Sequence, residues 1–203
     1  MVFARKPPIM VLSAACACCA PPKTAPPNDV DARRESASAQ PSGAPIPADR
    51  DADVTVEGGD WTAGIRERAP SAGGVALLRN IRAAKHAGLD RVVFEFEGAL
   101  PGYHVEYIDR PVRRCASGEV TQIEGDAWLE VRFERAQAHD EDGRASIVAR
   151  EQRPGLPIVR ELELTCDFEA VVSAVVGVSR PNRYRLMTLS APSRLVVDIR
   201  HAR

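Results

Sequence analysis

The sequence predicts an all-β fold, a small two-sheet β-sandwich built from a duplicated β unit and preceded by a disordered tether. Three observations predict it: two-residue alternation of apolar and charged residues, turn residues between the alternating runs, and an internal repeat. The repeat relates residues 103–113 to residues 184–194 at one constant offset. The matched pairs are Tyr103 with Tyr184, Val105 with Leu186, Ile108 with Leu189, Pro111 with Pro192, and Arg113 with Arg194.

Strands are predicted where apolar residues alternate with charged ones, at residues 91–97, 129–134, 161–168 and 195–200. In the third run Cys166 is expected on the inward face together with Leu162, Leu164 and Phe168. Residues 170–179 are apolar on both faces, which predicts a central strand or one covered by a loop. Upstream of the repeat, residues 171–172 echo residues 92–93 at a slightly shorter offset.

The composition divides the chain into three parts. Residues 21–74 hold few large apolar residues, and ten of the 16 prolines precede residue 75. Such a stretch cannot bury enough surface to offset its ordering entropy, so residues 21–74 are expected to be a disordered linker. Residues 75–203 form the predicted domain. With 27 basic and 28 acidic residues in the chain, the charge balance gives no reason to expect a nucleic-acid partner.

Residues 1–20 have the order of a secretory signal: basic residues, a short apolar run, then small residues and cysteines. Cys16 after a small-residue stretch predicts a lipobox and a lipid anchor at Cys16, with Cys18 and Cys19 as alternative acylation sites. Two other interpretations stay open, a random Ala/Cys-rich leader and a thiolate metal cluster. The protein is therefore expected to be exported and lipid-anchored to the cell envelope.

Two further cysteines, Cys115 and Cys166, lie in the predicted domain. In an exported chain a single pair of cysteines predicts a disulfide bond. It would close a loop of about 50 residues and stabilise the fold by roughly 4 kcal/mol on the chain-entropy model. The alternative is two separate buried thiols, because free cysteine packs as a small hydrophobe.

No pattern typical of a catalytic or metal site is found: there is no H-E-x-x-H, no nucleophile elbow and no phosphate-binding loop. The residues around His139, in the sequence His-Asp-Glu-Asp-Gly, are interpreted as a solvated hairpin turn rather than a cation site. His104 is expected to be an ordinary surface histidine. The sequence therefore predicts a protein without enzymatic activity and without a cofactor.

Four residues are candidate ligand contacts: Arg113, Arg194, Trp128 and Tyr107. Each arginine follows a proline corner, and a guanidinium can bind carboxylates such as those of peptide stems in bidentate fashion. The alternative for the arginines is a structural ion pair. The two aromatic rings can stack on sugars, or they can pack under a loop. Beyond Arg113 we expect the first copy of the unit to lose its closing strand.

The order of these segments resembles the AMIN domain, and most closely its AMIN-like variant of bacterial exported proteins and lipoproteins. The resemblance covers residues 75–203 and is most specific at Pro192 and at residues 194–198, Arg-Leu-Val-Val-Asp. It implies a symmetric sandwich of two small sheets and a non-catalytic role at the cell wall. AMIN domains accompany cell-wall amidases and pilus secretins, and they are thought to bind peptidoglycan.

The expected function is therefore a non-catalytic binding or localisation module whose partner is peptidoglycan or another envelope component. The alternative is an assembly module that binds an envelope protein through its strand edges.

Overall fold

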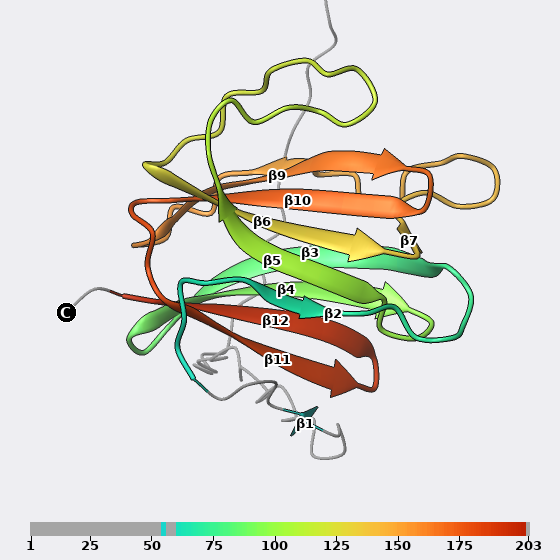
Figure 1. Ribbon diagram of the computed structural model, residues 1–203, viewed down its shortest axis with the longest axis horizontal. Helices are drawn as coiled ribbons and strands as arrows, with labels where there is room; N and C mark the ends of the chain where they lie inside the picture. Colours follow the sequence, from blue (N-terminus) through green and yellow to red (C-terminus); the bar gives the residue numbers. More distant parts are fainter. Residues whose placement is uncertain (1–53, 56–59, 202–203) are drawn as a thin grey trace, which may run out of the picture. The chain divides into compact units, whose positions relative to one another are not determined.

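The computed structural model describes residues 54–55 and 60–201, all within one compact unit, Ile46–Arg203. The described residues form twelve strands and no helix (Figure 1). Sheet A contains, in spatial order, β1 (Val54–Thr55), β11 (Tyr184–Ser190), β12 (Ser193–Arg200), β4 (Leu89–Glu97), β3 (Ala76–His86) and β7 (Ala136–Gln137). Sheet B contains β2 (Arg66–Arg68), β5 (Gly102–Ile108), β6 (Ala127–Glu134), β10 (Val171–Val178), β9 (Val159–Phe168) and β8 (Glu151–Gln152). The all-β class and the two packed sheets are confirmed.

The two sheets have the same arrangement of strands, and each sheet is built from strands of both halves of the chain. The hairpin β3–β4 lies in sheet A, but the next strand, β5, crosses to sheet B and pairs with β6. In the second half the hairpin β9–β10 lies in sheet B, and β11 crosses back to sheet A and pairs with β12. Each half therefore completes the sheet of the other, so neither half has a full sheet without its partner.

The crossing strands agree with the constant offset of the repeat, because the matched residues Tyr103 and Tyr184 are both buried, and so are Val105 and Leu186. Tyr103 of β5 lies opposite Phe133, and Tyr184 of β11 lies opposite Ile199. Phe133 in turn lies opposite Val172 of β10, while Ile199 lies opposite Asp90 of β4. The same registers therefore make β10 the counterpart of β4, and β12 the counterpart of β6.

The predicted upstream echo between residues 92–93 and residues 171–172 is wrong. By register Val92 corresponds to Ala174, and both residues are fully buried in the core. Val171 corresponds instead to Leu89, the first residue of β4. Both strands are rich in valine, so a match of neighbouring valines carries little information. The buried face fixes the register, because a shift by one residue would turn every side chain to the other face.

The core lies between the sheets and is filled by the alternating residues that the sequence predicts. Phe133 of sheet B packs edge-on against Phe94 and Phe96 of sheet A, with ring centroids 5.2 and 4.8 Å apart. β10 lies between β6 and β9, and its outer residue Val175 is fully buried. The strand that is apolar on both faces is thus both central and covered.

The predicted inward position of Cys166 is wrong, because β9 contains a bulge. Ser173 of β10 lies opposite Cys166, but the next residue, Ala174, lies opposite Leu164, which leaves Thr165 as an extra residue. An extra residue inverts the alternation beyond it. Cys166 and Phe168 therefore face outward, with Phe168 half exposed.

The folded part begins before the predicted boundary at residue 75. Within the stretch that we expected to be wholly disordered, β1 pairs with β11 and β2 pairs with β5. The backbone of Thr62 exchanges two hydrogen bonds with that of Tyr184, and the guanidinium of Arg185 lies 4.9 Å from the ring of Trp61. Strand pairing uses backbone groups, so a segment with few apolar side chains can still complete a sheet edge. The predicted signal, the lipidation site Cys16 and most of the linker lie outside the described residues.

Candidate functional site

The outer face of sheet A carries a hollow of about 270 Å³. Its floor is formed by Val93 of β4 and Val196 of β12, which lie opposite each other and alternate with the core residues Val92 and Val197. The other residues that line it are Arg82, Ala84, His86, Arg91, Leu189 and Arg194. An aliphatic floor with cationic walls is suited to a ligand that is partly apolar and partly anionic.

Two arginines of this face are fixed by one buried carboxylate. Asp198 of β12 is fully buried and accepts hydrogen bonds from Nε and a terminal nitrogen of Arg91 at 2.6 and 3.0 Å. Arg185 donates to the same carboxylate at 3.0 and 2.9 Å. Two guanidiniums thus share one negative charge, which leaves this part of the face positive.

Arg82 is held more loosely. Its guanidinium lies 3.2 Å from Glu95, and both side chains are partly exposed, at 46% and 27%. An exposed ion pair of this kind contributes only about 0–1 kcal/mol. Arg82 can therefore exchange Glu95 for another carboxylate at little cost.

Arg194, a predicted ligand contact, lines the hollow, but it is only 8% exposed. It donates to the backbone oxygens of Pro192 and Ala191, both at 3.3 Å. Its place is therefore the end of the hollow, against the turn between β11 and β12.

Arg113 lies elsewhere, in an exposed loop over sheet B, where it donates to the oxygen of Gly118 at 2.8 Å. The repeat extends through the proline corner, where the peptide bonds before Pro111 and Pro192 are both cis. Beyond that corner the register makes Trp128, and not Arg113, the counterpart of Arg194. The first copy does not lose its closing strand, because β6 follows after residues 109–126, a segment that we call the insert.

The family model of the AMIN-like domain matches residues 76–201. The chain belongs to the AMIN-like domain family. The match agrees with the fold, since the hairpins and the crossing strands of both sheets lie within it. No curated protein and no solved structure matches the chain. The family is that of exported, envelope-associated modules that are generally not catalytic.

Trp128 of the AMIN-like domain packs under the insert. Its indole nitrogen donates to the oxygen of Ile123 at 3.1 Å, and the guanidinium of Arg110 lies 4.1 Å from its ring. One face of the ring is thus occupied by an arginine and its edge by the insert. A sugar could stack on that face of Trp128 only after Arg110 moved away.

Tyr107 is also engaged within the domain. Its hydroxyl donates to the oxygen of Asn182 at 2.6 Å, and its ring packs edge-on against Tyr184 at 6.1 Å. Burial raises the pKa of the Tyr107 hydroxyl well above its ordinary value, and burial raises the pKa of Tyr184 to about 12. Both tyrosines therefore stay neutral hydrogen-bonding residues at any physiological pH.

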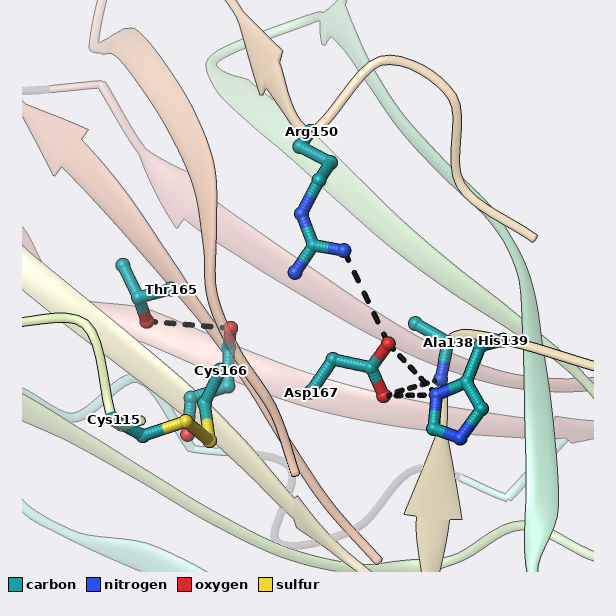
Figure 2. The surroundings of a disulfide bond; sticks show 8 residues. Cys115, Ala138, His139, Arg150, Thr165, Cys166 and Asp167 are labelled. Carbon is teal, nitrogen blue, oxygen red and sulfur yellow. Dashed lines mark hydrogen bonds and ion pairs between the residues drawn. A yellow bond between two sulfur atoms is a disulfide. The ribbon is translucent and has the colours of Figure 1, made fainter. Parts of the chain in front are cut away.

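The predicted disulfide between Cys115 and Cys166 is present and joins the insert to β9, with the two Cα atoms 5.2 Å apart (Figure 2). Next to it Asp167 points the other way, toward Ala138 and His139 (Figure 2). The Asp167 carboxylate accepts from the amide of Ala138 at 2.9 Å and lies 3.0 Å from the imidazole of His139. Arg150 lies 4.0 Å away, so this carboxylate is a structural anchor for the segment that follows β7.

The acidic turn after His139 is a hairpin turn. Its Asp140 carboxylate accepts from the backbone amides of Asp142 and Arg144 at 3.0 and 2.8 Å. Among the residues that the structure describes, no group of three or more histidines, cysteines or carboxylates is placed to hold a metal ion. The same part of the chain contains no helix long and apolar enough to cross a membrane.

The sequence reasoning missed most of the hollow, although a signal for it was present. Val93 and Val196 stand in the phase of the charged residues of their strands, where a solvated face is expected to carry polar side chains. Two aliphatic residues on the wet face of strands that pair with each other indicate an outer surface that is covered or used. Arg82 could not be found in this way, because its place beside Val93 depends on the bulge of β3 at Arg79.

Proposed function

We propose that this protein is a non-catalytic module that binds peptidoglycan through the hollow on the outer face of sheet A. The observation that carries the proposal is the combination of an aliphatic floor, Val93 and Val196, with the exchangeable cation Arg82 at its side. Peptidoglycan offers carboxylates and methyl groups close together. Membership of the AMIN-like family supports an envelope ligand for this surface.

The strand-edge alternative receives less support from the described part of the chain. The outermost strands β1, β7, β2 and β8 are only two or three residues long. Short edge strands are a means by which sheets avoid pairing with other chains. An outer face is therefore the better candidate for binding.

We also propose that Cys16 is acylated and that residues 21–53 tether the folded domain to the membrane. The order of basic, apolar and small residues before Cys16 supports this. The change Cys16→Ser should abolish incorporation of labelled palmitate and the partition of the protein into the detergent phase. Unchanged labelling would refute acylation at Cys16.

The binding proposal is tested by sedimentation with purified wall sacculi. The full-length chain should sediment with sacculi, and Arg82→Ala should weaken this binding. Arg79→Ala is the matched control, because Arg79 is a similarly exposed arginine of β3 that pairs with Glu97 and does not line the hollow. Equal binding by the two variants would show that the hollow is not the contact surface.

A further inference from the structure

The outer faces of the two sheets have equivalent positions, and the face of sheet A carries the hollow, whose floor residues Val93 and Val196 are 7% and 3% exposed. The registers place Val93, Leu189 and Arg194 of sheet A at the positions of Val175, Ile108 and Trp128 of sheet B. They also place Arg82 opposite Val93 and Glu163 opposite Val175. Four residues that line the hollow thus have direct counterparts on sheet B.

On sheet B the insert covers these counterparts, and Figure 1 shows it as the yellow-green loop on the side of sheet B away from sheet A. Val112 and Ile123 of the insert form a small apolar cluster with Val175, against which Ile108 and Trp128 also pack. The sheet supplies the floor of this cluster, and the two arms of the insert, joined by the antiparallel bridge between Arg113 and Val120, supply its cover.

The counterpart of Arg82 holds the insert by charge. Glu163 is 2% exposed and accepts hydrogen bonds from the guanidinium of Arg114 and from the hydroxyl of Thr121, the latter at 2.9 and 3.1 Å. The insert therefore makes two kinds of contact with sheet B. Its aliphatic side chains Val112 and Ile123 pack on Val175, and its charged residue Arg114 binds Glu163 beside them. In sheet A the sign at this position is reversed, from carboxylate to guanidinium.

We infer that the hollow of sheet A binds a peptide in the way that sheet B binds the insert, with an aliphatic side chain over Val93 and a carboxylate on Arg82. This inference rests on the proposed function and names the part of peptidoglycan that is recognised: the peptide stem and not the glycan strand. A stem peptide carries alanine methyl groups next to free carboxylates. These supply both contacts, whereas in intact peptidoglycan the lactyl carboxyls of the glycan strand that carry stems are bound in amide links to those stems and are uncharged.

The two faces differ in how closely a peptide backbone can approach. Sheet B has Gly177 where sheet A has Glu95, and a Cβ atom on Gly177 would lie 2.0 Å from the backbone oxygen of Glu124. The side chain of Glu95 keeps a ligand backbone further from β4. The ligand's carboxylate then replaces that of Glu95 as the partner of Arg82, which the exposed pairing of these two residues allows at little cost.

The test compares binding of the full-length chain to intact sacculi and to immobilised glycan strands from which an amidase has removed the stem peptides and whose freed lactyl carboxyls have been converted to methylamides. We expect binding to intact sacculi, loss of binding to the stripped strands, and competition by the free tripeptide L-alanyl-γ-D-glutamyl-meso-diaminopimelic acid. Arg82→Glu should weaken tripeptide binding by about tenfold or more, as expected for loss of a charge-assisted contact, while Arg79→Glu should stay within about twofold.

The outcomes separate the two proposals. Equal binding to intact and stripped material would overturn the peptide inference and leave the proposed function standing. No binding to intact sacculi would overturn the proposed function and the inference with it. Tripeptide binding that is equal in Arg82→Glu and Arg79→Glu would overturn the assignment of the hollow, whether or not the wall is bound.

Discussion

Replacing Gly177 by alanine should separate the insert from sheet B. The added Cβ would lie 2.0 Å from the oxygen of Glu124 and 2.9 Å from a methyl carbon of Ile123. An ordinary contact is about 3.5 Å or longer, so the insert must move outward by about 1.5 Å. That movement also breaks the 2.7 Å hydrogen bond from the amide of Glu124 to the carboxylate of Glu161. Glu161 is only 1% exposed, so its carboxylate would lose a partner inside the protein.

The expected cost is about 3 kcal/mol. Overpacking of a tight site contributes about 1–3 kcal/mol, and a lost hydrogen bond to a buried charge contributes about 1.5–3 kcal/mol. These two costs are not additive, because the same outward movement of the insert relieves the overpacking and breaks the hydrogen bond. The melting temperature should therefore fall by about 6–12 °C, and amide exchange should accelerate across residues 109–126.

Gly73→Ala is the matched control. A Cβ atom at Gly73 meets nothing within 4 Å, so its effect should remain within about 0.5 kcal/mol. If Gly177→Ala and Gly73→Ala had the same melting temperature, and the amides of the insert exchanged no faster, the predicted contact between Gly177 and the insert would be refuted. The comparison with sheet A would then lose its basis.

Four further predictions concern stability. Ala170→Gly should raise the melting temperature by a few degrees, because Ala170 has φ 59° in the turn between β9 and β10, a conformation that costs a non-glycine residue about 1–2 kcal/mol; an unchanged melt would contradict this. Burial raises the pKa of the Glu130 carboxyl in the folded chain, so its ionisation opposes folding at neutral pH. Glu130→Gln should thus be the more stable protein at pH 7 by urea unfolding, and this advantage should disappear below the ordinary carboxyl pKa of 4.5; a constant difference across pH would exclude the cause given. Arg194→Ala should cost about 1–3 kcal/mol of folding stability, because it removes a buried side chain and its hydrogen bonds to the turn. Arg113→Ala should cost well under 1 kcal/mol, because Arg113 is exposed. Equal shifts in melting temperature for the two variants would show that Arg194 is not the structural arginine of the pair. A chain that begins at Val75 should melt lower than the full-length chain by about 5 °C or more, since it lacks β1 and β2, and identical melting would place the start of the folded unit at residue 75.

The strands and the repeat could be predicted because they depend on local alternation and on a match between residues far apart in sequence. Tyr103 and Tyr184 take equivalent places, as their place in the repeat predicts. The disulfide could be predicted because the predicted domain, residues 75–203, contains a single pair of cysteines. The inward position of Cys166 could not be corrected from sequence, since the bulge at Thr165 does not interrupt the alternating pattern.

The candidate site was harder to predict, because it combines positions from several strands. Arg113 and Arg194 share a place in the sequence repeat, but the insert separates their structural places. Trp128 was a candidate ligand contact with packing under a loop as the alternative, and it lies under that insert. The hollow depends on a pairing of β3, β4 and β12 in which Arg82 comes to lie beside Val93, and no local pattern specifies this.

The most direct measurement of the central claim is a map of backbone amide chemical shifts of the isotopically labelled full-length chain during titration with soluble wall fragments that carry stem peptides. The account predicts the largest changes at Arg82, Val93 and Val196, and small changes throughout the insert. Largest changes on the insert or on sheet B, with the amides of sheet A unaffected, would contradict it.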